Sequence, residues 1–542
     1  MEADVLSLGY RGEGVAKIDR FPVFVKGALP GERIRARVLI AKKDYAVAKL
    51  TDILVSSPHR VQPPCPYFGK CGGCDLMHLD EEGQLAFKRN AVSRALFGIA
   101  HTDAEAGECV RSAKTLGYRN KLSLPVRRGS DGAEVGLFAY NTHRIVPISD
   151  CLLQTERVRA LMPKLNVFAS RFLPYDETTG KGELRHFTVR EYGGALSLTV
   201  VVTKDLSGRI LSAAAETGIE CDELWMNIND MTNNVILGRV SRLLAGENVV
   251  RDVLIGGRKL PVTSHPNAFF QVNDDIADKL YRTVRDIAER ERPSAIIDAY
   301  SGCGLMTALL SECADKTVGI EIEPSATAVA NDMMKRAGIT NVRNVCGDCA
   351  KILPDVAGEC GEDSLIVLDP PRSGCAESVT AAVNSCRART VIYVSCDPST
   401  LARDISRMPE YAPVSVTPFD MFPQTRHVET LVVLSKKIPD SHINIDVEFG
   451  EGEGQFSLKK IKECAEARKP KEKVTYKMIQ EYIEKTYGFK VHTAYIAEVK
   501  RDLGLPMYDA PNAVEELKRP RAHPTPKMAK AIKETLKHFE II

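Results

Sequence analysis

The stretch TVIYVSCDPSTLARD, residues 390–404, decides the fold class of this chain. Its first part, 391–394, is short, apolar and rich in β-branched residues, which predicts a buried central strand of a parallel sheet. Asp397-Pro398-Ser399 then has the composition of a turn and a helix cap. Cys396 therefore stands at the end of a strand, and ligands bind at the carboxyl ends of strands in open α/β sheets. A buried structural cysteine is the alternative that this segment leaves open.

Length, charge and cysteine content narrow the class of protein. A chain of 542 residues is too long for one core and indicates roughly three or four domains. The formal net charge of +2 is nearly neutral, so affinity for nucleic acid would have to come from local basic patches. The sequence has no run of about 18 apolar residues and no signal peptide, so we expect a cytoplasmic protein without membrane contact. Fifteen cysteines scattered through strand and helix patterns argue against disulfides and favour metal binding or thiol chemistry.

Residues 1–58 are predicted to form a small β-barrel that binds RNA. Short alternating runs are broken by glycines and by the turn LPG at 29–31. Arg33, Arg35 and Arg37 recur with a period of two, which places them on one face of a strand where they suit an RNA backbone. A solvated edge strand would carry the same stripe. The pattern resembles the TRAM domain of RNA-modifying enzymes.

Three cysteines follow the barrel in CPYFGKCGGC, residues 65–74. The glycines let the backbone fold tightly around a bound centre, and three ligands require a fourth. Cys151, in the turn-like ISDC at 148–151, is the candidate, with Cys109 as the alternative. Four thiolates hold either zinc or an iron–sulfur cluster, and the spacing alone does not distinguish the two.

Residues 59–270 alternate strand-like runs with helical stretches such as 82–96, which predicts a central α+β domain. Near its end, NAFFQVN at 267–273 carries Gln271 and Asn273 after an aromatic pair, and these amides could cap a helix or contact a ligand. A loose basic set could follow RNA phosphates: Lys88, Arg89, Arg119, Lys121, Arg127 and Arg128.

Residues 271–436 repeat strand and helix patterns, which predicts a doubly wound parallel sheet of Rossmann type. SGCG at 301–304 opens a helix, and Glu321 ends the next strand, where an acid is placed for ribose hydroxyls. Because GCG is not the dinucleotide fingerprint, a smaller nucleoside-bearing cofactor is expected. Asp348, Asp369 and Cys396 follow the next three strands. A purely structural sheet would not need polar or reactive side chains at the ends of so many strands, and this favours Cys396 as a functional thiol.

The end of the chain differs in composition. An acidic linker is expected at 437–456 and a basic helical extension at 457–542, because from residue 459 onward nineteen Lys or Arg face twelve Asp or Glu. Thr525-Pro526 should start a final helix. The extension could bind nucleic acid or dock as a helical cap.

Seven motifs in order resemble those of the S-adenosylmethionine-dependent RNA 5-methyluridine methyltransferases, over about residues 1–436. They are C-x5-C-x2-C, FFQVN, DAYSGCG, GIEI, LDPPRSG, YVSCDPSTLARD and HVETLVVL. The resemblance implies a class I methyltransferase domain behind a TRAM domain and an iron–sulfur domain. Ser301 departs from the family, which often has a second cysteine there.

The resemblance also assigns roles to residues of this chain. Cys396 would be the nucleophile and Glu429 the base that removes the C5 proton. A [4Fe-4S] cluster, favoured over zinc, would be held by Cys65, Cys71, Cys74 and Cys151. Cofactor or substrate contacts would come from Gln271, Tyr300, Glu321, Asp348 and Asp369. The implied partner is RNA, 23S ribosomal RNA ahead of transfer RNA, bound by a monomer.

The chemistry fits these residue types independently. Uracil C5 is a weak nucleophile, so a thiolate must first add at C6, and a base must later remove the C5 proton. The uracil must also leave the base stack of the RNA before these groups can reach it. An amino methyltransferase acting on adenine or guanine is disfavoured because Pro370-Pro371 is followed by Arg372 and not by an aromatic residue. A non-catalytic RNA-binding adaptor is the alternative from another class.

Overall fold

The computed structural model describes residues 1–129, 132–247, 250–437, 476–503 and 523–539. The chain divides into two compact units, Met1–His442 and Ile443–Ile542. Within the described ranges, no helix is long and apolar enough to cross a membrane. Residues 438–456 of the predicted acidic linker lie outside these ranges.

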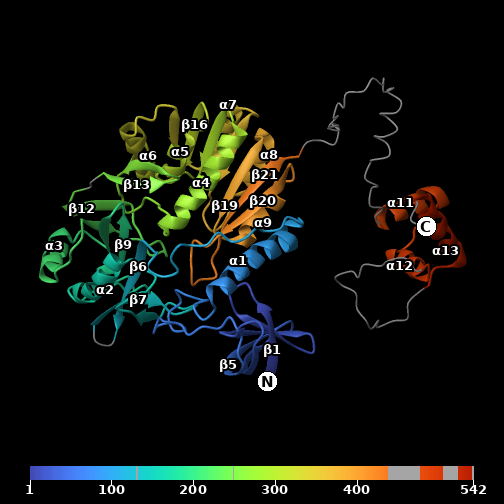
Figure 1. The fold of residues 1–542 in the computed structure, drawn as a ribbon, viewed down its shortest axis with the longest axis horizontal. Coiled ribbons are helices and arrows are strands. Elements are labelled where there is room, and N and C mark those ends of the chain that lie inside the picture. Colours follow the sequence, from blue (N-terminus) through green and yellow to red (C-terminus); the bar gives the residue numbers. More distant parts are fainter. Residues whose placement is uncertain (130–131, 248–249, 438–475, 504–522, 540–542) are drawn as a thin grey trace, which may run out of the picture. The chain divides into compact units, whose positions relative to one another are not determined.

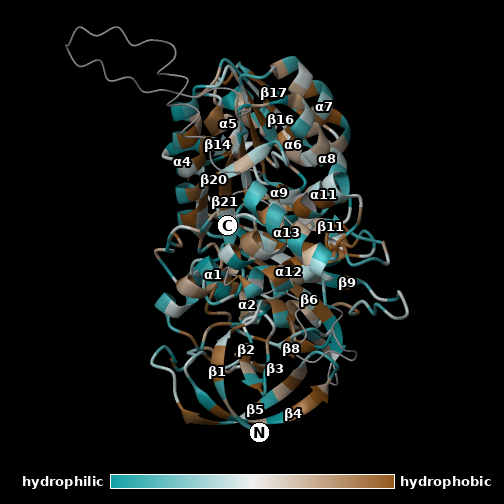
Figure 2. Ribbon diagram, turned by 90° about the vertical axis from the view of Figure 1, so that its right-hand side faces the viewer, coloured by the Kyte–Doolittle hydropathy of each residue, from teal (hydrophilic) through white to brown (hydrophobic). Residues whose placement is uncertain are grey.

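The first unit begins with a closed five-stranded barrel. Its strands are β1 (Glu2–Leu8), β2 (Gly14–Ile18), β3 (Phe21–Lys26), β4 (Arg33–Ala41) and β5 (Ala46–Val55). Ile34 and Ala36 of β4 are buried in the barrel while Arg33, Arg35 and Arg37 alternate with them on the outside, as the period of two predicted. Figure 2 shows brown, apolar ribbon along β4, where Val38, Leu39 and Ile40 are exposed.

A seven-stranded sheet, called here the central sheet, follows in the order β12-β11-β10-β9-β6-β7-β8. Helices α2 (Glu156–Ala169) and α3 (Ser207–Glu216) share one hydrophobic core with it. The short hairpin β13 (Arg251–Ile255) and β14 (Arg258–Val262) packs instead on the next region of the chain. The strands of the central sheet are β6 (Lys121–Gly129), β7 (Gly132–Phe138), β8 (Ile145–Pro147), β9 (Leu184–Tyr192), β10 (Ala195–Val202), β11 (Glu223–Ile228) and β12 (Val240–Gly246).

A second seven-stranded sheet, the α/β sheet, has the order β17-β16-β15-β18-β19-β21-β20. Its first five strands are parallel, as the sequence predicted, whereas β21 runs antiparallel to both β19 and β20. This antiparallel hairpin at one edge was not predicted. The strands are β15 (Ala295–Ala299), β16 (Lys316–Glu321), β17 (Val342–Cys346), β18 (Ser364–Leu368), β19 (Thr390–Ser395), β20 (Tyr411–Phe419) and β21 (Glu429–Lys436).

Helices cover both faces of the α/β sheet, which makes it doubly wound (Figure 1). One face carries α4 (Asp274–Glu291), α5 (Leu305–Leu310) and α6 (Pro324–Arg336). The other carries α7 (Cys349–Cys360), α8 (Glu377–Cys386) and α9 (Pro398–Ser406). Apolar strands buried on two faces explain why β18 and β19 read as continuous hydrophobic runs in the sequence.

Helix α1 (Glu81–Ala95) joins the barrel to the α/β sheet. Phe87 packs with Leu8 and Leu29 of the barrel region, whereas Val92 lies in the core that α7, α8 and α9 form on the α/β sheet. The π-helix η1 (Leu96–Ala100) continues this contact onto α9. Helix α1 therefore precedes the central sheet in sequence but completes one face of the α/β sheet, which comes after the central sheet.

The described residues of the second unit form three helices, α11 (Tyr476–Tyr487), α12 (Thr493–Asp502) and α13 (Pro526–His538). They pack around a small core that includes Ile483, Ile496, Ile532 and Leu536. Thr525 caps α13 by accepting a hydrogen bond from the backbone N–H of Met528 (3.4 Å), so the last helix starts where Thr525-Pro526 indicated.

Candidate active site

A cavity of about 890 Å³ lies where the α/β sheet faces the central sheet. The carboxyl ends of several parallel strands open into it, as the strand-exit argument predicted. All eleven residues to which the family resemblance assigned a role line this one cavity: Cys65, Cys71, Cys74, Cys151, Gln271, Tyr300, Glu321, Asp348, Asp369, Cys396 and Glu429. A single site therefore contains the thiol, the carboxyl groups and the cysteine motif.

Cys396 is partly buried, and hydrogen bonds fix the residues on both sides of it. The hydroxyl of Ser395 donates to the carbonyl oxygen of Asp397 (3.1 Å), and Asp397 Oδ1 accepts from the backbone N–H of Ser399 (2.8 Å) at the start of α9. Burial raises the pKa of the Cys396 thiol to about 12, the charge of Glu429 adds to this, and Arg372 acts in the opposite direction. In the free protein Cys396 is therefore a thiol and not a thiolate.

Glu429 begins β21 and is almost completely buried beside the thiol. Burial, and after it the charge of Asp369, raises the pKa of Glu429 well above the usual value for a glutamate. Burial and the charge of Asp298 likewise raise the pKa of Asp369 to about 7. A partly buried thiol and a buried carboxyl group of raised pKa are suited to nucleophilic addition followed by proton transfer.

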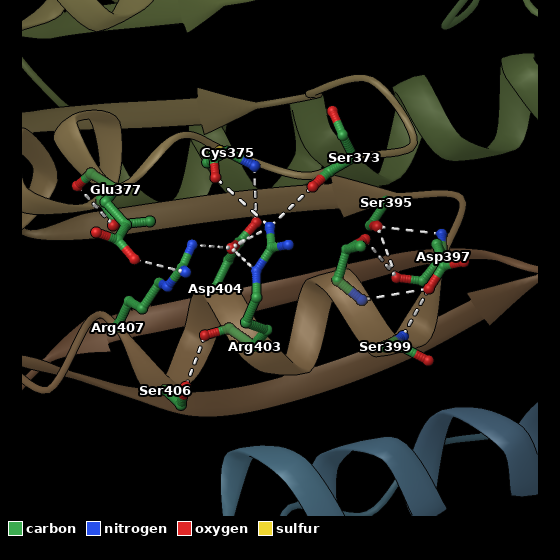
Figure 3. Close-up of polar contacts among 12 residues, drawn as sticks. Ser373, Cys375, Glu377, Ser395, Asp397, Ser399, Arg403, Asp404, Ser406 and Arg407 are labelled. Carbon is green, nitrogen blue, oxygen red and sulfur yellow. Dashed lines mark hydrogen bonds and ion pairs between the residues drawn. The ribbon is translucent and has the colours of Figure 1, made fainter.

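The loop that carries Arg372 is held to α9 by the buried carboxylate of Asp404. Asp404 Oδ2 accepts hydrogen bonds from the backbone N–H of Cys375 (2.7 Å) and from the hydroxyl of Tyr393 (2.7 Å). Arg403 binds the other oxygen of Asp404 and also donates to the carbonyl oxygen of Ser373 (2.8 Å; Figure 3). The loop after β18 and the helix after Cys396 are therefore tied into one structure.

The turn SGCG contributes Gly302 to the cavity wall. Glu321 Oε2 accepts from the backbone N–H of Gly302 (2.9 Å), which holds the acid of β16 against the turn after β15. Gly304 has a φ of +80°, and a Cβ on it would lie 2.7 Å from Ala330, so glycine is required there for α6 to approach. Asp348 caps α7 through the backbone N–H of Ala350 (3.0 Å) and still lines the cavity.

The two amides of FFQVN have different surroundings. Asn273 is the N-cap of α4 and also donates to the hydroxyl of Ser112 (3.0 Å). Gln271 lines the cavity. The sequence left open whether these amides cap a helix or contact a ligand. Asn273 caps a helix, whereas Gln271 lies in the cavity wall.

The wall formed by the central sheet contains two residues of the predicted basic set. Arg119 and Lys121 line the cavity, and burial, followed by the charges of Arg190 and Arg119, lowers the pKa of Lys121 to about 7. Lys88, from the same predicted basic set, is instead fully buried and paired with Asp420, so the expectation that it follows RNA phosphates was wrong. No local signal separates these lysines in the sequence.

The cysteine motif lines the same cavity. Cys65, Cys74 and Cys151 pack in one cluster with Met77 and Leu153, and burial together with the neighbouring thiols raises the pKa of Cys74. The structure thus brings Cys151 to the motif, whereas the charges that act on Cys109 are those of Lys88 and Asp420. Among the described residues, no three His, Cys, Asp or Glu side chains are arranged to hold a metal ion as they stand.

Family models match both ends of the first unit. Residues 1–51 match the TRAM domain, and residues 351–437 match the family described as tRNA (uracil-5-)-methyltransferase. The second match contains the loop with Arg372, the nucleophile candidate Cys396 and the base candidate Glu429.

Longer matches cover most of the chain. It is 34% identical over 440 residues to an uncharacterized RNA methyltransferase of Clostridium tetani, a match that covers 80% of this chain and 95% of that protein. It is 35% identical over 447 residues to an uncharacterized RNA methyltransferase of Clostridium acetobutylicum, a match that covers 79% of this chain and 95% of that protein. The fold is similar to that of the Pyrococcus abyssi tRNA (uracil-54, C5)-methyltransferase in complex with S-adenosyl-L-homocysteine, with a TM-score of 0.65, 26% identity, and coverage of 80% of this chain and 100% of that one.

These matches remove the alternative of a non-catalytic adaptor. The chain belongs to the RNA methyltransferase family of these relatives, with the tRNA (uracil-5-)-methyltransferase region at 351–437 and a TRAM domain at its N-terminus.

Proposed function

We propose that the protein transfers a methyl group from S-adenosylmethionine to C5 of a uridine in RNA. The observation that carries this proposal is the presence of Cys396, Glu429 and Asp369 in one cavity, beside the turn at 301–304. Ribosomal RNA, 23S rRNA in particular, is proposed ahead of transfer RNA because the barrel and the cysteine motif occur together, an argument by analogy with the family. We further propose that the protein acts as a cytoplasmic monomer.

In the proposed reaction, the thiol of Cys396 loses its proton to solvent and the resulting thiolate adds to C6 of the flipped uracil, while the electron pair of the C5–C6 bond moves toward C5 and O4. When bound, S-adenosylmethionine supplies the methyl group and, on its sulfonium, a positive charge that favours the ionised forms of Cys396 and Glu429. After C5 carries the methyl group, Glu429 accepts the C5 proton. The C5–C6 double bond then re-forms as the bond from C6 to the Cys396 sulfur breaks.

The residues around the turn at 301–304 fit the cofactor. Glu321 has a carboxylate aligned by backbone N–H groups and faces the cavity, where it suits ribose hydroxyls. Tyr300, Asp348, Gln271 and Asp369 line the same cavity. The expectation that these five residues contact the cofactor or substrate is kept as part of the proposal.

Cys65, Cys71, Cys74 and Cys151 are proposed to hold a [4Fe-4S] cluster, because four thiols on one wall are the donor set that such clusters use. The cluster would order the segment from 65 to 151. Protein purified without air should contain iron and sulfide and absorb broadly in the visible range. Zinc without iron would contradict the cluster.

The reaction is tested by mapping 5-methyluridine in total RNA from cells with and without the gene. One or more uridines should lose their methyl group, and the purified protein should restore it. An RNA with 5-fluorouridine at that position should form a covalent adduct with the wild type but not with Cys396→Ala. Cys346→Ala is the matched control, because Cys346 is exposed at the end of β17. Full turnover by Cys396→Ala would refute the mechanism.

A further inference from the structure

A second pocket, of about 390 Å³, adjoins the catalytic cavity. The two share Gly73 and His427 in their walls, so they are neighbours along one surface. Three segments form the second pocket: the cysteine motif at 72–75, the turn between β7 and β8 at 138–143, and residues 426–427 just before Glu429. Nothing in the proposed methyl transfer uses it.

Aromatic side chains form one part of this pocket. Phe138 and Tyr140 come from the end of β7 and the turn after it, and the ring of His143 lies 5.5 Å from that of Phe138. Tyr140 is also contacted by the barrel, since the ammonium of Lys26 lies 3.9 Å from the centre of its ring. The ring is thereby held in place, and a positive charge from the TRAM domain stands beside it.

Polar groups form the rest of the pocket. Asn141 is exposed at the tip of the turn, with a φ of +54°. Arg426 is partly buried, and its Nη1 lies 3.6 Å from Oδ1 of Asp75. Burial and the charges of Arg372 and Arg426 lower the pKa of His427 to about 3, so its ring is neutral and can both donate and accept hydrogen bonds.

Aromatic faces, an arginine and an exposed amide are the groups that proteins use to read unstacked bases of single-stranded RNA. Because the pocket shares a wall with the cavity that would hold the flipped uracil, a base seated in it would belong to a nucleotide close to the target. Lys26 would then stand near the backbone of the same RNA segment.

We propose that this second pocket binds the base of a nucleotide flanking the target uridine, with Tyr140 as its stacking surface and Asn141 and Arg426 as its polar contacts. The proposal rests on the proposed function. It assigns part of the substrate selectivity to the turn between β7 and β8, outside the methyltransferase sheet.

The test uses a short RNA that spans the mapped uridine, and matched RNAs with an abasic site at each flanking position in turn. With the wild type, one abasic position should weaken RNA binding by about 5- to 100-fold, the range expected for loss of one stacked base. Tyr140→Leu should weaken binding of the intact RNA to a similar degree. For Tyr140→Leu, the same abasic position should cause little further loss, because the contact is already absent.

Three comparisons keep the outcomes distinct. Phe97→Leu, at an aromatic side chain 70% exposed and outside both pockets, should bind RNA as the wild type does. Asn141→Ala gives a second variant of the pocket that leaves the rings in place. Unchanged S-adenosylmethionine binding by calorimetry shows that Tyr140→Leu is folded.

The inference would be overturned if, at every flanking position, the abasic site weakened RNA binding by the same factor in Tyr140→Leu as in the wild type. The same holds if no abasic position matters to the wild type. In both cases methylation of the intact RNA by the wild type leaves the proposed function standing. If the wild type methylates no RNA, the proposed function itself has failed.

Discussion

The hydroxyl of Tyr10, in the loop between β1 and β2 of the barrel, donates a hydrogen bond of 2.6 Å to Oδ2 of Asp397. Asp397 directly follows Cys396, and its other carboxylate oxygen accepts from the backbone N–H groups of Ser399 and Thr400 at the start of α9. The TRAM domain therefore touches the turn that holds the proposed nucleophile. A domain expected to bind RNA also takes part in the geometry of the candidate active site.

Replacing Tyr10 by phenylalanine removes this hydrogen bond and keeps the ring. Because Tyr10 is 52% exposed, the folded state should lose less than about 1 kcal/mol. We expect kcat to fall several-fold while the KM for RNA stays the same, since the turn around Cys396 loses one support. Tyr45→Phe, elsewhere on the barrel, is the control. A change confined to the KM for RNA would show that Tyr10 acts as an RNA contact.

Glu429→Gln should stop the reaction after methyl transfer, because the C5 proton then has no acceptor. Stability should change little, since burial raises the pKa of Glu429 and so favours its neutral form, and the amide has the same shape. A methylated covalent complex with RNA should accumulate and be visible by denaturing electrophoresis. Glu377→Gln, at an exposed glutamate paired with Arg407, is the control. Release of product at the wild-type rate would mean that another group is the base.

Binding of S-adenosylmethionine should make Cys396 more reactive toward iodoacetamide. The pKa of the thiol is raised to about 12, so almost none is thiolate at neutral pH, and a nearby positive charge lowers that pKa. Each unit by which the pKa falls should increase the thiolate fraction about tenfold, and the alkylation rate by about three- to fourfold, because a less basic thiolate is a weaker nucleophile. Mass spectrometry of the peptide follows the rate.

S-adenosylhomocysteine is the matched ligand for this experiment, because its sulfur carries neither the methyl group nor the charge. The exposed thiol of Cys346 serves as the internal reference. Equal acceleration by both ligands would exclude an electrostatic cause.

Lys88→Met should destabilise the protein strongly. The ammonium of Lys88 is completely buried, is paired with Asp420 and also donates to the carbonyl oxygen of Phe422 (2.9 Å). Removal of one partner of a buried pair leaves an uncompensated charge and costs about 3–5 kcal/mol. Denaturant titration should show this loss, and Lys88→Met/Asp420→Leu should recover most of it. Arg336→Met, in the exposed pair with Asp332, should cost less than about 1 kcal/mol.

Much of the α/β sheet could be predicted from local sequence. The run 391–394 was predicted as a strand and lies within β19 (Thr390–Ser395), and the turn residues after it indicated α9. Continuous apolar runs with turn signals at both ends are sufficient for strands buried on two faces. The antiparallel direction of β21 could not be predicted in this way, because strand direction depends on where the chain returns and not on the composition of the strand.

The site was predictable on one side only. Glu321, Asp369 and Cys396 were found because each follows a recognisable strand. Lys121 was proposed only for RNA phosphates and His427 was given no role, because the presence of both in the cavity depends on how the central sheet and the segment before β21 pack against these strand ends. Lys88 was misjudged for the same reason, since its partner Asp420 is 332 residues away.

The position of α1 has a consequence for the order in which the protein is made. Synthesis from the N-terminus produces α1 long before α9 and the strands of the α/β sheet that it covers. Until residues 398–406 have been added, α1 lacks its contacts with α9. The barrel can complete its hydrogen bonds early, because all its strands lie within the first 55 residues. The nascent chain must therefore carry an uncovered apolar helix face through the synthesis of the whole central sheet.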